Sequence, residues 1–204
     1  PDGSATPPDD FIPAAEIAGL ISDIGDYVFR TACREIRRLS DHHGALTFSV
    51  NTSPIELQDP AFADRIIATL KETGVAANQV ELEITETAMT HFAENQLAAL
   101  NRLRDHGLSI SLDDFGTGAS SLANLVRLPI DRVKLDRSFV ANIEKNESAY
   151  ILVKHAVEIA RDLGKEVTVE GVETFEVKEL VRLLGADEIQ GFYYAKPKPP
   201  SAFE

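Results

Sequence analysis

Six short strand-like segments alternate with amphipathic helical segments along this chain, and this order constrains the fold more than any other feature. The predicted strands cover residues 46–51, 80–85, 109–113, 132–136, 166–170 and 188–190. Alternating strands and helices indicate a parallel sheet. A closed (β/α)8 barrel needs eight such units. Six units therefore leave two possibilities: a barrel whose first two strands precede Pro1, or an open doubly wound sheet.

The apolar spacing predicts where the helices lie and which faces they bury. We expect residues 1–10 to form a loop, and helices near 21–39, 59–72, 86–104, 148–163 and 175–184. In the 148–163 helix the predicted buried stripe is Leu152, Ala156, Ile159 and Leu163. Each of these helices fills the interval between two predicted strands or flanks the first one, as a βα repeat requires.

Composition narrows the class of protein. Hydrophobic residues make up 44% of 204 residues, enough for one substantial core, and no apolar run approaches the roughly 18 residues of a membrane span. The net charge of −13 argues against binding DNA, RNA or anionic membranes. Cys33, the single cysteine, predicts a buried packing role in a reducing compartment, and thus a cytoplasmic domain. Because the chain starts at Pro1, we expect it to be part of a longer protein, which upstream segments could tether to a membrane.

Polar residues follow the predicted strands where each one ends. Since the carboxyl ends of parallel strands meet at one edge, we expect these side chains to share a site. Asp113 and Asp114, taken alone, could equally be an ordinary turn before a glycine loop. The full set makes a site the better interpretation: Asn51, Glu83, Asp113, Asp114, Lys134, Glu170 and Gln190.

The residue types predict the chemistry of this site. Carboxylate and amide oxygens suit Mg²⁺ or Mn²⁺ better than Zn²⁺. With Asp113 bridging, two such ions could activate a water molecule and stabilise the leaving oxygen of a phosphodiester. Lys134 and Glu170 are the candidates to orient and deprotonate that water. We expect the nearby metal ions and Lys134 to favour an ionised Glu170.

Six motifs in order resemble those of the EAL-domain cyclic di-GMP phosphodiesterases. The segment Phe11–Glu16 matches that family as well. The motifs are Asn51-Thr52-Ser53, Glu83-Ile84-Thr85-Glu86, Asp113-Asp114-Phe115-Gly116-Thr117-Gly118, Val133-Lys134-Leu135-Asp136-Arg137-Ser138-Phe139, Glu170-Gly171-Val172-Glu173-Thr174 and Gln190-Gly191-Phe192.

The resemblance implies a TIM-like (β/α)8 barrel that hydrolyses cyclic di-GMP to linear pGpG with two Mg²⁺ or Mn²⁺ ions. It implies Lys134 and Glu170 as catalytic residues, Gln190 as a supporting residue and Phe192 as a surface for a guanine. Glu86 would anchor the loop containing Gly116 and Gly118, and Glu173 would be structural. It also implies a homodimer with upstream sensory or GGDEF-type domains. The implied metal ligands are Asn51, Glu83, Asp113, Asp114 and Glu170.

The sequence also departs from this family. The Glu-Ala-Leu motif, whose glutamate is a metal ligand there, is absent, so residues 1–204 are expected to be an N-terminally incomplete EAL-type domain. Ala119 and Val169 replace residues common in the family. The absent glutamate keeps open a receptor that binds cyclic di-GMP without cleaving it. A Schiff-base aldolase using Lys134 is a third possibility.

Overall fold

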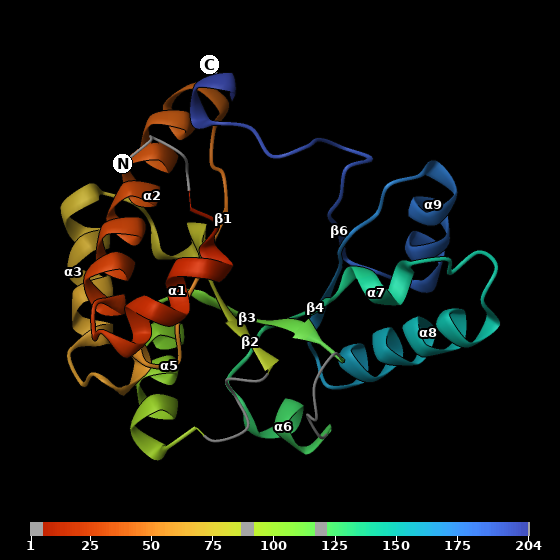
Figure 1. Ribbon diagram of the computed structural model, residues 1–204, viewed down its shortest axis with the longest axis horizontal. Coiled ribbons are helices and arrows are strands. Elements are labelled where there is room, and N and C mark those ends of the chain that lie inside the picture. Colours follow the sequence, from red (N-terminus) through yellow and green to blue (C-terminus); the bar gives the residue numbers. More distant parts are fainter. Residues whose placement is uncertain (1–5, 87–91, 117–121, 204) are drawn as a thin grey trace.

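The computed structural model describes residues 6–86, 92–116 and 122–203, in which six parallel strands form one curled sheet (Figure 1). Each strand is hydrogen-bonded to the next one in the chain, so the order is β1-β2-β3-β4-β5-β6. A doubly wound sheet would reverse direction at a switch point. In the described residues no reversal occurs, and the sheet is a partial barrel wall. The strands are β1 Phe48–Asn51, β2 Val80–Thr85, β3 Ser109–Phe115, β4 Arg132–Leu135, β5 Glu166–Val169 and β6 Glu188–Ile189.

Helices cover the outer side of this wall (Figure 1). Short 3-10 turns lie at Glu56–Gln58, Ala77–Gln79 and Pro200–Phe203. The last of these brings the C-terminal segment back to α2, where the His43 ring is hydrogen-bonded to the Phe203 carbonyl. The α-helices are α1 Pro8–Ile17, α2 Ile21–His43, α3 Phe62–Thr73, α5 Glu94–Asp105, α6 Leu122–Arg127, α7 Arg137–Val140, α8 Glu147–Asp162 and α9 Phe175–Leu184.

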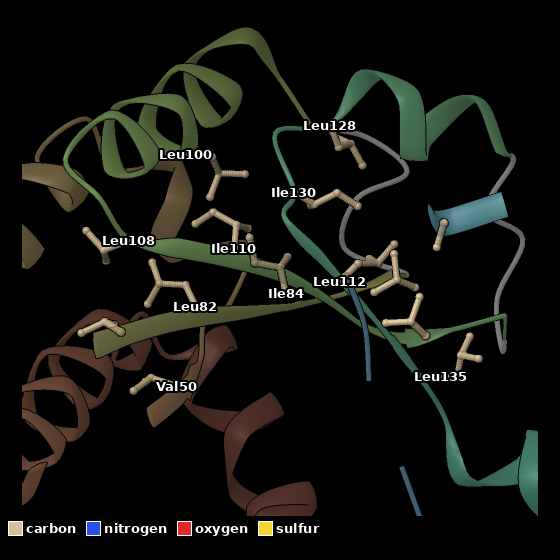
Figure 2. Close-up of a cluster of buried hydrophobic side chains, with 14 of the residues drawn as sticks. Val50, Leu82, Ile84, Leu100, Leu108, Ile110, Leu112, Leu128, Ile130 and Leu135 are labelled. Carbon is tan, nitrogen blue, oxygen red and sulfur yellow. The ribbon is translucent and has the colours of Figure 1, made fainter. Parts of the chain in front are cut away.

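The two faces of the sheet differ in chemistry because strand side chains alternate in direction. Leu82, Ile84, Ile110 and Leu112 are at most 1% exposed and belong to the core beneath the helices. Figure 2 shows them gathered with Leu100 of α5. The residues between them point to the concave face. Several of these are also buried although they are polar or charged: Glu81, Glu83, Ser111, Lys134 and Thr168.

The predicted βα order is confirmed, with three local corrections. The helix predicted near 86–104 is interrupted, because Phe92 and Ala93 are not helical and α5 begins at Glu94. Residues 8–10 were expected in a loop, but α1 begins at Pro8, a residue whose fixed φ suits a first helical position. The predicted stripe of α8 was also wrong, because Leu152 is 58% exposed. The buried face instead consists of smaller residues, which let the helix approach the sheet closely: Ala149, Val153, Val157 and Ala160.

Two further sequence features can be placed in the fold. Cys33 is fully buried in α2 and packs within the core. Among the described residues, no helix combines the length and the hydropathy needed to cross a bilayer.

Candidate active site

Lys134 stands at the centre of a carboxylate cluster on the concave face of the sheet. Its neighbours Val133 and Leu135 are buried on the opposite face, so strand geometry directs the lysine inward. The Lys134 Nζ atom lies 2.6 Å from Glu170 Oε1, 2.7 Å from Glu83 Oε1 and 3.4 Å from Asp113 Oδ1. The Lys134 side chain is 6% exposed. The parallel order thus brings together three carboxylates that lie far apart in sequence.

The charge state of Lys134 follows from these contacts. Burial alone would lower the pKa of Lys134, but the hydrogen bonds and charges of Glu170 and Glu83 raise it above its usual value. The lysine is therefore a fixed ammonium. An imine-forming lysine needs a lowered pKa instead, so this geometry argues against the aldolase hypothesis.

The protein groups around Glu170 shift its pKa in opposite directions. Burial raises the pKa of Glu170. Lys134 lowers that pKa, as expected, whereas the charges of Asp113 and Glu83 raise it further, and the net direction is upward. A raised pKa makes the Glu170 carboxylate a stronger base.

Asp113 and Asp114 lie at an irregularity in β3. The strand continues to Phe115, beyond its predicted end, and its register against β4 shifts between Leu112 and Phe115. Asp114 has a φ of 54°, which aspartate tolerates better than most residues, and its amide donates to Asp113 Oδ1 at 3.0 Å. Such bulges redirect side chains beside active sites.

The loop after this bulge is held at its start by Glu86. This residue is 1% exposed, and its carboxylate accepts a hydrogen bond from the Gly116 amide. Gly116 has a φ of 91°, and a Cβ there would lie 2.2 Å from the Phe139 ring. Both facts require glycine. Gly118 lies outside the described residues.

The other predicted site residues lie at or near the same rim, but outside the ion pairs of Lys134. Asn51 ends β1 and is in register with Glu83. Gln190 follows β6. Its backbone N–H donates to the Val169 carbonyl, and its backbone carbonyl accepts from the Val172 N–H.

Phe192 is 54% exposed, with Lys196 Nζ 5.6 Å from its ring centroid. Glu173 is exposed beside a cavity of about 480 Å³ that Arg137 and Gly171 also line. The functions of these four residues stay predictions.

The donor set of this rim fits a hard divalent cation by its chemistry. In the described part of the chain, no three acidic, histidine or cysteine side chains are already arranged as a metal cage. The cluster nevertheless has one ammonium for four carboxylates, Glu83, Asp113, Asp114 and Glu170. Burial and the charges of Asp113 and Asp136 raise the pKa of Asp114, which reflects this surplus of negative charge. Oxygen ligands of this kind suit Mg²⁺ or Mn²⁺.

Sequence reasoning missed a second charged layer beneath the cluster. Glu81 and Arg132 precede Glu83 and Lys134 by two residues, so they share the concave face. Both side chains are mostly buried and they face each other at 3.3 Å. The alternation within each strand was the available signal, since it assigns residues i and i+2 to one face.

Comparisons with known proteins agree with this arrangement. The EAL domain family model matches residues 1–197. Cyclic di-GMP phosphodiesterase NbdA of Pseudomonas aeruginosa is 38% identical over 97% of this chain and 25% of its own length. A signaling protein of Caulobacter vibrioides is 40% identical over 99% of this chain and 25% of its own length. The chain thus spans about a quarter of these relatives.

Solved structures give the same result. The PaMucR phosphodiesterase in complex with cyclic di-GMP has a TM-score of 0.91 and 33% identity, covering 100% of this chain and 83% of that one. The EAL enzyme Bd1971, with cAMP and cyclic di-GMP bound, has a TM-score of 0.93 and 28% identity, covering 100% of this chain and 56% of that one. With these matches over almost its whole length, the chain belongs to the EAL domain family.

Proposed function

We propose that this chain provides the active site of a metal-dependent phosphodiesterase that hydrolyses cyclic di-GMP to linear pGpG. The observation that carries this proposal is the cluster of Glu83, Asp113 and Glu170 around buried Lys134 at the carboxyl ends of the strands. The names of relatives such as NbdA support the substrate.

In this proposal the rim would hold two Mg²⁺ or Mn²⁺ ions. Glu83 and Asp113 are already near each other through Lys134, and Asp114 follows at the bulge. Bound ions would supply Lewis-acid stabilisation of the phosphodiester oxygens. The residues that would ligate them are Asn51, Glu83, Asp113, Asp114 and Glu170.

Glu170 and Lys134 would manage the attacking water. The raised pKa of Glu170 suits a general base, and its 2.6 Å contact with Lys134 fixes its orientation. The water oxygen forms a bond to phosphorus while the bond from phosphorus to the ribose oxygen breaks. Glu170 takes the proton of the water and releases it to solvent, and solvent supplies a proton to the departing ribose oxygen.

Residues around the cluster would bind the rest of the nucleotide and couple the site to its surroundings. Gln190 would support the site, and the exposed ring of Phe192 would stack on a guanine. Glu86, Gly116 and Gly118 would control the loop after Asp114, and Glu173 would support the neighbouring turn. We propose a cytoplasmic homodimer. A bifunctional relative, MucR, supports an upstream GGDEF-type or sensory domain.

A receptor that binds cyclic di-GMP without cleaving it is the second candidate. The observation favouring it is that the Lys134 ammonium already occupies the centre of the carboxylate cluster. A receptor would bind the nucleotide with or without divalent metal and release no pGpG.

Chromatographic detection of pGpG from the full-length protein, incubated with cyclic di-GMP and Mg²⁺ or Mn²⁺, distinguishes the two. We expect turnover, and its loss in Glu170→Gln and Glu83→Gln. Glu158→Gln is the matched control, because Glu158 is half exposed on α8 away from the sheet. Tight nucleotide binding without pGpG would establish the receptor, and neither binding nor turnover would refute both.

A further inference from the structure

A second cation-centred layer lies beneath the Lys134 cluster. Arg132 precedes Lys134 by two residues on β4 and reaches three glutamates with three different nitrogens. Its Nε lies 3.3 Å from Glu81 Oε2, its Nη2 lies 2.6 Å from Glu166 Oε2, and its Nη1 is ion-paired with Glu188. One side chain therefore connects four strands of the sheet.

These contacts extend beyond neighbouring strands. Arg132 is in register with Ser111 of β3, yet it pairs with Glu81 of β2, one strand further on. On the other side it contacts Glu166, its partner in β5, and Glu188 of β6. An ion pair between strands that are not adjacent constrains the curvature of the sheet. Hydrogen bonds between adjacent strands constrain this curvature less.

The arm toward Glu81 is the most buried part of this tie, although the Arg132 Nε has no hydrogen-bond partner among the described residues. The Arg132 and Glu81 side chains are 16% and 4% exposed, whereas Glu166 and Glu188 are 61% and 54% exposed. Exposed ion pairs contribute little, but a buried pair cannot lose one partner without a large penalty. Glu81 is held further by Ser49 of β1, whose hydroxyl donates to Oε1 at 3.2 Å.

We propose that Arg132 is a positioning residue for the site above, because it sets the distance between β2 and β4 at which Glu83 meets Lys134. This inference rests on the proposed phosphodiesterase function. The two layers have the same arrangement. In the lower layer Arg132 of β4 pairs with Glu81 of β2 across β3. About 6.6 Å further along β2 and β4, Lys134 pairs with Glu83 across β3. A change in the lower layer is transmitted along two stiff strands to the upper one.

The guanidinium is the group suited to this task. Its planar fork presents nitrogens in several directions, while a lysine ammonium is a single point of charge. Arg132→Lys therefore keeps the charge but cannot hold three glutamates at once. We expect kcat to fall by about 10- to 100-fold in Arg132→Met and by a smaller factor in Arg132→Lys, since a displacement near 1 Å suffices for such losses.

The experiment compares the full-length wild type with Arg132→Met, Arg132→Lys and the double variant Arg132→Met/Glu81→Gln. The measurements are kcat and KM for cyclic di-GMP, Mn²⁺ affinity by calorimetry without nucleotide, and thermal unfolding. We expect weaker Mn²⁺ binding and lower kcat, with KM changed by less than about threefold. Arg104→Met is the matched control, because Arg104 pairs with Asp131 at 2.8 Å from helix α5 rather than from the concave face.

The double variant separates positioning from general stability. Removing both buried charges should restore the melting temperature, because no buried carboxylate is left unpaired and Glu166 and Glu188 are exposed to water. In contrast, kcat and Mn²⁺ affinity should stay low. The proposal is overturned if kcat returns together with stability, if Arg132→Met keeps wild-type kcat and Mn²⁺ affinity, or if Arg104→Met loses as much activity. If the wild type itself shows no turnover, the proposed function fails, and Mn²⁺ affinity alone still decides the role of Arg132.

Discussion

Replacing Lys134 by methionine is the most informative perturbation of the site. Methionine keeps a long apolar side chain but removes the ammonium that lies 2.6 Å from Glu170, 2.7 Å from Glu83 and 3.4 Å from Asp113. All four side chains are largely buried. Removing one partner of a buried ion pair costs about 3–5 kcal/mol, because the remaining charge loses its compensation. We expect a loss of this size in metal-free Lys134→Met.

Urea unfolding followed by circular dichroism measures this loss, first in EDTA and then with Mn²⁺. A metal that binds only the folded state stabilises it by about 2.7 kcal/mol at a concentration of one hundred times its Kd. Without the ammonium, the carboxylates should bind Mn²⁺ more tightly, so the metal should recover more stability in Lys134→Met than in wild type. Hydrolysis of cyclic di-GMP should remain lost, since Glu170 no longer has its orienting partner.

Lys154→Met provides the control, because Lys154 is exposed on α8 with its amine 3.8 Å from Glu158. Exposed pairs of this kind contribute about 0.3–0.5 kcal/mol. The reasoning is refuted if Lys134→Met unfolds at the same urea concentration as wild type in EDTA. Equal stabilisation of both proteins by Mn²⁺ would refute the link between the ammonium and the metal site.

Other consequences of the structure can be tested in the same way. Burial raises the pKa of Glu56 to about 7, although the Ser53 amide donates to its carboxylate. Wild type should therefore lose stability as pH rises through that value. Above it, Glu56→Gln should unfold at a higher temperature than wild type, and its stability should depend less on pH. Gly116→Ala should cost more than Gly164→Ala in urea unfolding, because both glycines have positive φ but only the first would clash with Phe139; equal losses would contradict the clash. Chelation should abolish pGpG formation, and added Mg²⁺ or Mn²⁺ should restore it; turnover that persists in EDTA would exclude metal dependence.

Much of the fold could be predicted because periodicity is a local signal. The strand at 80–85 and the helix at 175–184 have their predicted limits, since each has strong periodicity and a clear boundary. The buried face of α8 could not be predicted, because its sequence offers two adjacent apolar stripes and the sheet selects the one with smaller residues. Helix α1 was missed at its start, since proline and aspartate also favour loops.

The candidate site was predictable to the extent that topology alone determines it. Parallel strands bring their carboxyl ends together, so Glu83, Asp113 and Glu170 could be grouped without coordinates. The bulge at Asp113 could not be foreseen, because it depends on the register between β3 and β4. The effect of burial on the pKa of Glu170 could not be predicted either, since a sequence gives the charge of a neighbour but not the burial of a side chain.

The concave face combines two demands that usually conflict. A barrel interior excludes water, whereas the proposed phosphodiester chemistry requires many charges there, and buried charge is costly unless it is paired. Here each layer has one cation for several carboxylates: Arg132 in the lower and Lys134 in the upper. The lower layer has three glutamates for one guanidinium, but Glu166 and Glu188 are more than half exposed, so water screens their charges. In the upper layer, burial and the charges of neighbouring carboxylates raise the pKa values of Asp114 and Glu170, and the surplus of negative charge favours a divalent cation at the rim.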